Sequence, residues 1–279
     1  MPEDARGALV ARVRPVPGSR TDPSLEAVLS ARVTNRLAYD ARPLSAAHRD
    51  ALFSAVAPFE PDVRMEWVDT PASRDVVANA MAVYNRVLFE NDGLLTSFLT
   101  WLRRTPAEAE ATRDGLSLES LELGRLGGAL FTLAASTWRA PLLAWTGLFS
   151  LFQKGSAARS RRSAAFGMLS IPLNDVESLV TAGRALEILW LKATQRGLAF
   201  QPLAGPLLLM SRMRFSGGAG LTARQQRLAH RMMADLGRVF PFFDTRCPAV
   251  FFRVGHAPAP TARSLRHSVD SLFTDLTTK

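Results

Sequence analysis

The clearest alternation of apolar and polar positions lies in residues 174–205, which read NDVESLVTAGRALEILWLKATQRGLAFQPLAG. Apolar side chains recur near the helical period in the first part of this stretch, which predicts an amphipathic helix. Asn174 stands where it can cap the first turn, and Glu177 three residues later can reach back to the cap. Gly197 predicts a left-handed end to the helix.

A short apolar segment follows this helix, and residues 198–201 are expected to form a buried strand. Pro202 is expected to end the strand, because proline cannot donate to a sheet ladder. The chain then brings a turn, Pro202-Leu203-Ala204-Gly205, to the edge of the core. Backbone amides in such a turn can face a ligand, and Gly205 would admit a flat ring at close range. A core helix packed on a strand, without a ligand, explains the same pattern.

Elsewhere in the chain, capping residues indicate where helices are expected to begin. Thr70 is expected to cap a long helix that has Pro71 at its first position, and Thr222 with Gln225 forms a capping-box pattern. We expect helices at residues 24–36, 45–56, 71–89, 94–103 and 222–236, strands at 64–68, 166–171 and 249–254, and a solvated basic loop at 154–162.

The most apolar run of the chain is residues 127–152, GGALFTLAASTWRAPLLAWTGLFSLF. A membrane helix needs about 20 consecutive apolar residues, and Arg139 and Pro141 interrupt this run near its middle. We therefore expect no stable insertion into a membrane. Two short helices, in an apolar insertion at about residues 124–162, are expected to cover a pocket or to pack against a partner subunit. The candidate substrate or lid residues are Trp138, Arg139 and Trp145.

The net charge indicates which class of partner suits the chain, and the cysteine content indicates its compartment. The chain of 279 residues has a formal net charge of +9 and 47% hydrophobic residues, which predicts a globular protein with anionic partners. Arginine is spread along the whole chain, which favours a phosphate site over a nucleic-acid tail. Cys247 is the only cysteine, and residues 1–22 lack the apolar core of a secretory signal, so a reducing cytoplasm is expected. We interpret residues 1–22 as a flexible arm and 23–279 as one domain.

Several kinds of chemistry lack residues at the required spacing. The histidines, His48, His230, His256 and His267, lie far apart and form no metal-ligand pattern. The sequence contains no Gly-x-Ser-x-Gly elbow and no Walker-type lysine loop. The glycines of residues 217–220 match no complete dinucleotide fingerprint.

The informative polar cluster is Arg32-x-Thr34-x-Arg36. On a helix, residues four apart share a face, so the two arginines and the hydroxyl would form a small anion site. Arginine suits phosphate because its planar fork binds two oxygens at once. A solvated basic helix end is the alternative explanation.

Residues 31–44, which read ARVTNRLAYDARPL, contain Arg32-x-Thr34-x-Arg36 and resemble the opening of nitroreductase-family flavoproteins. The usual signature of that family is Arg-x-Ser-x-Arg or a lysine variant. Residues 193–198, with their sequel at 201–205, resemble the family's second flavin-contact segment, and residues 263–266 resemble its C-terminal phosphate contact. The order and spacing agree over roughly residues 24–272. Within the family, the chain is most similar to the large actinobacterial branch with flavin-sequestering, Acg-like members.

The resemblance implies bound FMN and a role for each matching position. Arg36 is expected beside the pyrimidine edge of the flavin, where a cation stabilises the negative charge of the reduced ring. Ala204 and Gly205 are expected at the N5 side, through a backbone amide, and Arg263 and Arg266 at the phosphate. The expected cofactor-binding residues are Arg32, Thr34, Arg36, Pro202, Leu203, Ala204, Gly205, Arg263 and Arg266, with Asn85 a candidate contact on a middle helix.

The resemblance further implies an α+β fold with a central, mostly antiparallel sheet flanked by helices, in a homodimer with exchanged C-terminal tails. The expected function is an FMN-dependent oxidoreductase that uses NADH or NADPH to reduce a nitro, quinone or other conjugated acceptor by hydride transfer through flavin N5. The flavin would do the chemistry, so no catalytic side chain and no metal are expected. The alternatives are a non-catalytic flavin-sequestering protein, a tailoring dehydrogenase in a biosynthetic pathway and, from another class, a nucleic-acid-binding protein. We expect no nucleic-acid partner.

Overall fold

Four strands form the central sheet in the order β1-β4-β6-β5, and every neighbouring pair is antiparallel. These strands are β1 (Arg64–Val68), β4 (Ala165–Ile171), β5 (Ala199–Leu203) and β6 (Cys247–Gly255). The computed structural model describes residues 22–124, 127–128, 131, 155 and 157–268.

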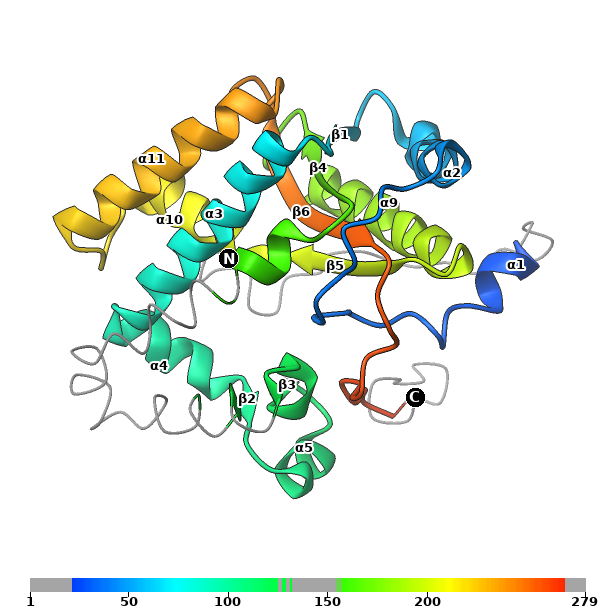
Figure 1. Cartoon of the computed structure of the whole chain (residues 1–279). Helices are drawn as coiled ribbons and strands as arrows, with labels where there is room; N and C mark the ends of the chain where they lie inside the picture. Colours follow the sequence, from blue (N-terminus) through cyan, green and yellow to red (C-terminus); the bar gives the residue numbers. More distant parts are fainter. Residues whose placement is uncertain (1–21, 125–126, 129–130, 132–154, 156, 269–279) are drawn as a thin grey trace, which may run out of the picture.

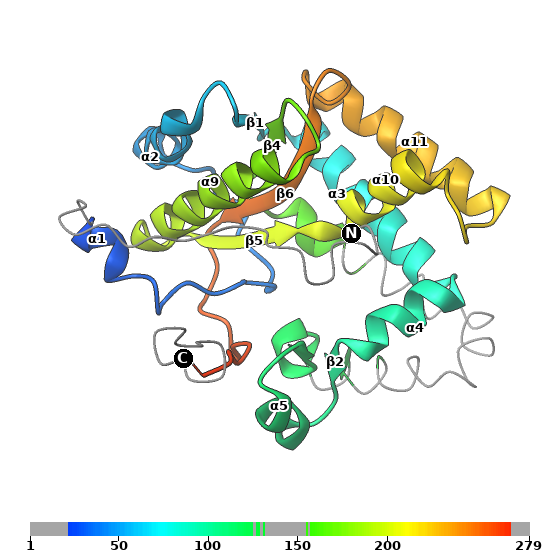
Figure 2. The same ribbon diagram turned by 180° about the vertical axis from the view of Figure 1, so that it is seen from behind.

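Helices cover both faces of this sheet, with α2 and α9 on one side and α3, α10 and α11 on the other (Figures 1 and 2). This arrangement confirms the expected α+β fold with an antiparallel sheet flanked by helices. The remaining elements are α1 (Pro23–Glu26), α2 (Ala46–Val56), η2 (Ala57–Phe59), α3 (Pro71–Phe89), α4 (Asp92–Thr100), β2 (Leu102–Arg103), α5 (Pro106–Thr112), β3 (Leu116–Ser117), η3 (Glu119–Leu121), α9 (Val176–Gln195), α10 (Ala204–Ser216) and α11 (Ala223–Val239).

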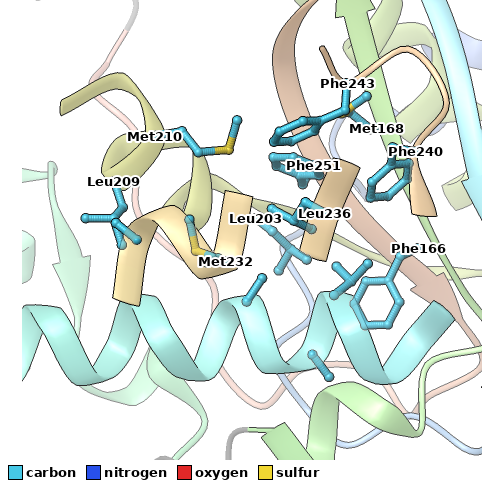
Figure 3. Packing of buried hydrophobic residues seen from close by; sticks show 14 of the residues in the cluster. Phe166, Met168, Leu203, Leu209, Met210, Met232, Leu236, Phe240, Phe243 and Phe251 are labelled. Carbon is cyan, nitrogen blue, oxygen red and sulfur yellow. The ribbon is translucent and has the colours of Figure 1, made fainter. Parts of the chain in front are cut away.

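Each face of the sheet packs on its own apolar cluster, because successive side chains of a strand point to opposite faces. Phe166 and Met168 of β4 pack with α3, α10 and α11 (Figure 3). Leu169 and Ile171 of the same strand pack with α2 and α9. All of β4 is buried, which explains why this strand reads as a continuous apolar run.

A smaller unit lies beside the sheet and is built from α4, α5, η3 and the parallel pair β2-β3 (Figure 1). Its cluster includes Leu102 and Phe131, and the Phe131 ring lies 5.9 Å from the ring of Phe89 and 6.3 Å from that of Phe98. Most of the predicted apolar insertion lies outside the described residues. Within the described ranges, no helix combines the length and the apolar character that crossing a bilayer requires.

Several predicted elements are confirmed at their expected positions. The strand at residues 64–68 is β1, the helix that begins at Pro71 is α3, and the capping box of Thr222 with Gln225 opens α11. The predicted strand at 166–171 is β4. The predicted strand at 249–254 is β6, which extends beyond the prediction at both ends.

The prediction of a helix over residues 24–36 was wrong. Helix α1 ends at Glu26, and residues 32–36 belong to no helix or strand. Tertiary contacts override the local helical preference here, because the backbone N–H of Asn35 donates to the carbonyl of Phe200 at 3.0 Å. Arg32 and Arg36 therefore do not share a helix face.

Two details around α9 also differ from the sequence prediction. The residue that caps α9 is Asp175, whose side chain accepts from the Ser178 N–H at 2.8 Å, and not Asn174. Pro202 does not end the strand, since β5 continues to Leu203. It is tolerated because β5 is an edge strand, whose single neighbour within the described part of the chain is β6. Gly197 does end the helix region with φ +67°.

The basic segment at residues 154–162 is not the solvated loop that was predicted, since residues 157–161 are helical. Arg161 pairs with Asp75 at 3.2 Å and donates to Asn79 Oδ1 at 2.7 Å. Ser160 is buried. Arg161 is therefore engaged with α3, which a charge pattern alone does not reveal. The helix predicted at 94–103 is α4, which begins at Asp92 and ends at Thr100.

Gly167 in β4 is a position where the fold requires the absence of a side chain. A Cβ at Gly167 would lie 2.1 Å from Cζ of Phe252 on the neighbouring strand. We expect Gly167→Ala to lower the free energy of unfolding by about 1–3 kcal/mol through overpacking. Thermal or urea unfolding measures this loss, and adding Phe252→Leu should recover part of it. Gly183→Ala on α9, where a Cβ meets nothing within 4 Å, is the control and should be neutral or stabilising.

Glu66 is a buried carboxylate in β1 with only one oxygen satisfied. Its Oε2 accepts from the Phe242 N–H at 2.9 Å, while Oε1 has no partner among the described residues. Burial raises the pKa of Glu66 above its ordinary value of 4.5, against the opposing effects of the Phe242 N–H, Ser170 and Arg246. The folded state therefore binds more protons than the unfolded state just above pH 4.5, and stability falls as pH rises through that window.

We expect Glu66→Gln to match the wild-type melting temperature in acid, where the native carboxyl is protonated, and to exceed it increasingly toward neutral pH. Thermal melts from below pH 4.5 to pH 8 measure this. A constant difference between the two proteins across that range would contradict the assignment of the burial effect to Glu66.

Candidate functional site

A cavity of about 250 Å³ lies between the β5–β6 edge of the sheet, α3 and the smaller helical unit. Its walls have two chemical characters. The side chains of the arginines, Asn85, Gln201 and Ser160 form a polar part, while the leucines, Met81 and the aromatic rings form the rest. The lining residues are Arg36, Met81, Tyr84, Asn85, Leu88, Phe89, Phe98, Leu116, Leu121, Leu123, Phe131, Arg159, Ser160, Gln201, Leu203 and Arg253. A concave, mostly apolar site with a few convergent polar groups is typical of small-molecule binding.

Arg253 on β6 is the most buried charged group of the cavity, with 2% of its surface exposed. Its Nε donates to Gln201 Oε1 at 2.6 Å, and its Nη2 donates to the carbonyl of Leu37 at 2.9 Å and to that of Asn35 at 3.3 Å. The guanidinium carbon lies 4.0 Å from the centre of the Tyr39 ring, in a cation–π contact. These contacts fix the orientation of the guanidinium.

The Nη1 of Arg253 is buried and has no hydrogen-bond partner among the described residues. Burial lowers the pKa of Arg253, Tyr39 opposes the shift, and the nearby positive charges of Arg159 and Arg36 add to it. A buried donor without an acceptor is costly unless a ligand or water satisfies it.

Arg36 and Arg159 place two more positive charges in the cavity wall. The Nη1 of Arg36 donates to the carbonyl of Ser120 at 3.0 Å, and the Nη1 of Arg159 donates to the carbonyl of Glu122 at 3.3 Å. Burial is the main cause that lowers the pKa of both arginines. No carboxylate is among the described residues that line the cavity, so its field is positive and favours an anion or an acceptor-rich group.

Gly205 was predicted to admit the flat ring of a ligand, and in the structure the ring that lies against it is the side chain of Tyr84. A Cβ at Gly205 would lie 2.3 Å from Cδ1 of Tyr84. Leu203 lines the cavity, and Ala204 and Gly205 form the first turn of α10, whose N-terminus has no side-chain cap. Burial raises the pKa of Tyr84, so its phenol stays protonated at neutral pH.

Arg32 and Arg263 lie together away from the cavity wall. Arg32 Nε lies 2.8 Å from Glu187 Oε1, and its guanidinium stacks 4.3 Å from the centre of the Trp190 ring. The Nη2 of Arg263 donates to the carbonyl oxygens of Ser30 and Arg32. Arg32 of the predicted anion site and Arg263 of the predicted phosphate contact are therefore engaged by the protein's own groups, at α9 and at residues 30–32 respectively.

The other predicted residues are dispersed. Thr34 is partly buried in the segment after α1, and Pro202 pairs with Phe252 across the sheet. The carbonyl of Arg266 accepts from Arg113 Nε at 2.9 Å. The predicted lid residues, Trp138, Arg139 and Trp145, lie outside the described residues. Arg36 and Leu203 thus meet at the cavity and Arg32 meets Arg263, whereas Arg266 joins neither pair.

Sequence reasoning missed Arg253, Arg159 and Tyr84. A signal for Arg253 was present, because an arginine inside the apolar run of residues 249–254 has to be paired when the strand is buried. Arg159 and Tyr84 gave no such signal, since Arg159 stands in a basic run that was predicted to be a solvated loop and Tyr84 stands in an ordinary helical pattern. Asn85, the candidate contact on a middle helix, does line the cavity. The described part of the chain contains no group of three His, Cys, Asp or Glu side chains able to hold a metal ion.

No protein-family model matches the chain, and no curated protein matches it. Among solved structures, the FMN-dependent nitroreductase NfnB from Mycobacterium smegmatis, in complex with NADPH, is similar with a TM-score of 0.52 and 18% identity over 91% of this chain and 98% of that one. The FMN- and NADPH-dependent nitroreductase NfnB from Sphigopyxis sp. strain HMH is similar with a TM-score of 0.50 and 16% identity over 90% of this chain and 97% of that one. The chain therefore has the nitroreductase-like fold.

Proposed function

We propose that this protein is an FMN-dependent oxidoreductase that takes a hydride from NADH or NADPH and reduces a small conjugated acceptor, such as a nitro compound or a quinone. One observation carries the proposal. The fold brings Arg36 and Leu203, from two motifs far apart in the sequence, into the wall of one cavity. The neighbours with this fold are described as FMN-dependent nitroreductases.

The residues of the cavity fit an isoalloxazine ring. One end of that ring carries carbonyl and nitrogen acceptors, and the other is an apolar dimethylbenzene. The buried Nη1 of Arg253 lacks an acceptor, and Arg36 and Gln201 stand on the same polar side. Phe98 and Phe131 line the apolar part. A ring bound across the cavity would supply an acceptor for Nη1 of Arg253 and would bury the dimethylbenzene end of the ring among these phenylalanines.

FMN, when bound, supplies hydride chemistry that protein side chains lack. The chain's own part is to bind, orient and keep water away. Arg36 fixes a positive charge at the polar end of the cavity, where it favours an electron-rich ring. The apolar wall excludes water. Arg263 and Arg266 remain the proposed phosphate contacts. Arg32 would bind the phosphate only if its guanidinium left Glu187, or bound Glu187 and the phosphate at the same time.

The homodimer with exchanged C-terminal tails, the Acg-like relationship and the cytoplasmic location belong to this proposal. So does the division into a flexible arm at residues 1–22 and one domain from residue 23 onward. A second candidate function, binding of FMN without turnover, is favoured by Tyr84. Its ring covers Gly205, where the resemblance places the N5 side of the flavin.

We expect purified protein, incubated with FMN and then desalted, to retain visible flavin absorbance because the cavity holds the ring. Addition of NADPH without oxygen should bleach that absorbance, and an added quinone should restore it. Protein that stays colourless after incubation with excess FMN would refute the proposed function. Flavin that is retained but never bleaches would favour the non-catalytic alternative.

We expect Arg36→Ala to weaken FMN binding by about 10–100-fold, the value of a hydrogen bond to a charged group. It should also lower the midpoint potential of bound flavin. The decrease is about 30 mV for each tenfold drop in the ratio of the affinity for reduced flavin to the affinity for oxidised flavin. Titration and spectroelectrochemistry measure both. The control is Arg42→Ala, because the side chain of Arg42 is 65% exposed and forms an ion pair with Asp40 at 3.5 Å, and Arg42 is not among the residues that line the cavity. An unchanged potential in Arg36→Ala would contradict the placement of the ring beside Arg36.

A further inference from the structure

The unsatisfied Nη1 of Arg253 is a specific feature of the cavity that the phosphate and ring contacts expected from the sequence do not include. Arg253 is 2% exposed, and its other donors have acceptors on Gln201, Leu37 and Asn35. A buried charged donor left without an acceptor destabilises the protein, because nothing compensates for its lost hydration. A site that keeps such a donor in its wall is suited to a ligand that brings the missing acceptor.

The rest of the cavity decides which acceptor fits. A phosphate dianion seeks several donors that converge on one point, and here the Nη1 groups of Arg36 and Arg159 are directed at the carbonyls of Ser120 and Glu122, so that only their other nitrogens remain for a ligand. Most of the wall is apolar, with Phe89, Phe98 and Phe131 among the rings. Burying a doubly charged group against such a wall costs more than burying a planar ring with carbonyl or nitrogen acceptors on one edge.

We propose that Arg253 is a ligand-binding residue, and that it holds the acceptor edge of a planar heteroaromatic ring through Nη1. The ring of the cofactor then occupies the inner cavity, and the phosphate lies outside it. This inference rests on the proposed function, which it deepens by assigning one end of FMN to one set of residues. Gln201 and the two main-chain carbonyls act as positioning groups, because they occupy Nε and Nη2 and hold the guanidinium in one orientation.

The test uses a ring without a phosphate. Lumiflavin carries a methyl group in place of the ribityl phosphate, so its affinity reports the ring site alone. We expect flavin-free wild-type protein to bind lumiflavin, and Arg253→Gln to weaken both lumiflavin and FMN by the same factor, about tenfold or more. Inorganic phosphate should compete with FMN equally well in both proteins. Fluorescence titration measures all of these affinities.

The matched control is Arg246→Gln. Arg246 also donates to main-chain carbonyls, those of Pro61, Asp62 and Ser170 at 3.1, 2.7 and 3.1 Å, but it does not line the cavity. Its loss should leave lumiflavin affinity unchanged. Arg253→Lys is the second variant, because it keeps the buried positive charge if Arg253→Gln does not fold. It lacks the second terminal nitrogen and should weaken lumiflavin as well.

Equal lumiflavin affinity in wild type and in a folded Arg253 variant would overturn the inference while leaving the proposed function intact. Loss of phosphate competition in that variant would also overturn it, since the phosphate would then occupy the inner cavity. Wild-type protein that binds neither FMN nor lumiflavin would instead refute the proposed function itself.

Discussion

The burial of one positive charge in the central sheet controls the architecture around the cavity. Arg253 lies on β6, where water does not reach it, so its donors require acceptors from the chain. The carbonyls of Asn35 and Leu37 supply two, and the Tyr39 ring faces the guanidinium. These contacts hold the segment after α1 against the sheet in a non-helical conformation. Arg36, which stands between these two residues in the sequence, is thereby brought to the cavity.

The polar side and the apolar side of the cavity come from two different parts of the fold. The polar side belongs mainly to the sheet edge, where Gln201 and Arg253 sit opposite each other on β5 and β6. The apolar side belongs mainly to the smaller unit and the end of α3, where the rings of Phe89, Phe98 and Phe131 pack edge to face. Neither part alone encloses a ligand. The position of the smaller unit against α3 therefore determines the volume and the chemistry of the site.

The sequence predicted elements well where a local signal agrees with tertiary packing. Pro71 after a capping threonine, and the capping box at Thr222, each specified a helix start through local hydrogen bonds. The segment at residues 32–36 was predicted wrongly because its conformation depends on carbonyl and amide groups of distant strands. At the site, Arg36 and Leu203 do line the cavity. The role of Arg253 was missed, because the apolar residues around it predict a strand and say nothing about which donor stays free.

If the cavity binds FMN as proposed, Tyr84 determines whether the site favours chemistry or storage. Turnover requires that a nicotinamide and then an acceptor reach the N5 side of the flavin, which the resemblance places at Gly205. The Tyr84 ring occupies the space directly over that glycine, and it is anchored on α3, which packs on α10 and α11. An aromatic side chain can rotate within its helix more easily than the helix can move. Access to Gly205 therefore depends on a rotation of Tyr84 into the cavity volume, and a ring already bound there opposes that rotation. The same packing that would hold flavin firmly thus slows the exchange of substrates beside it.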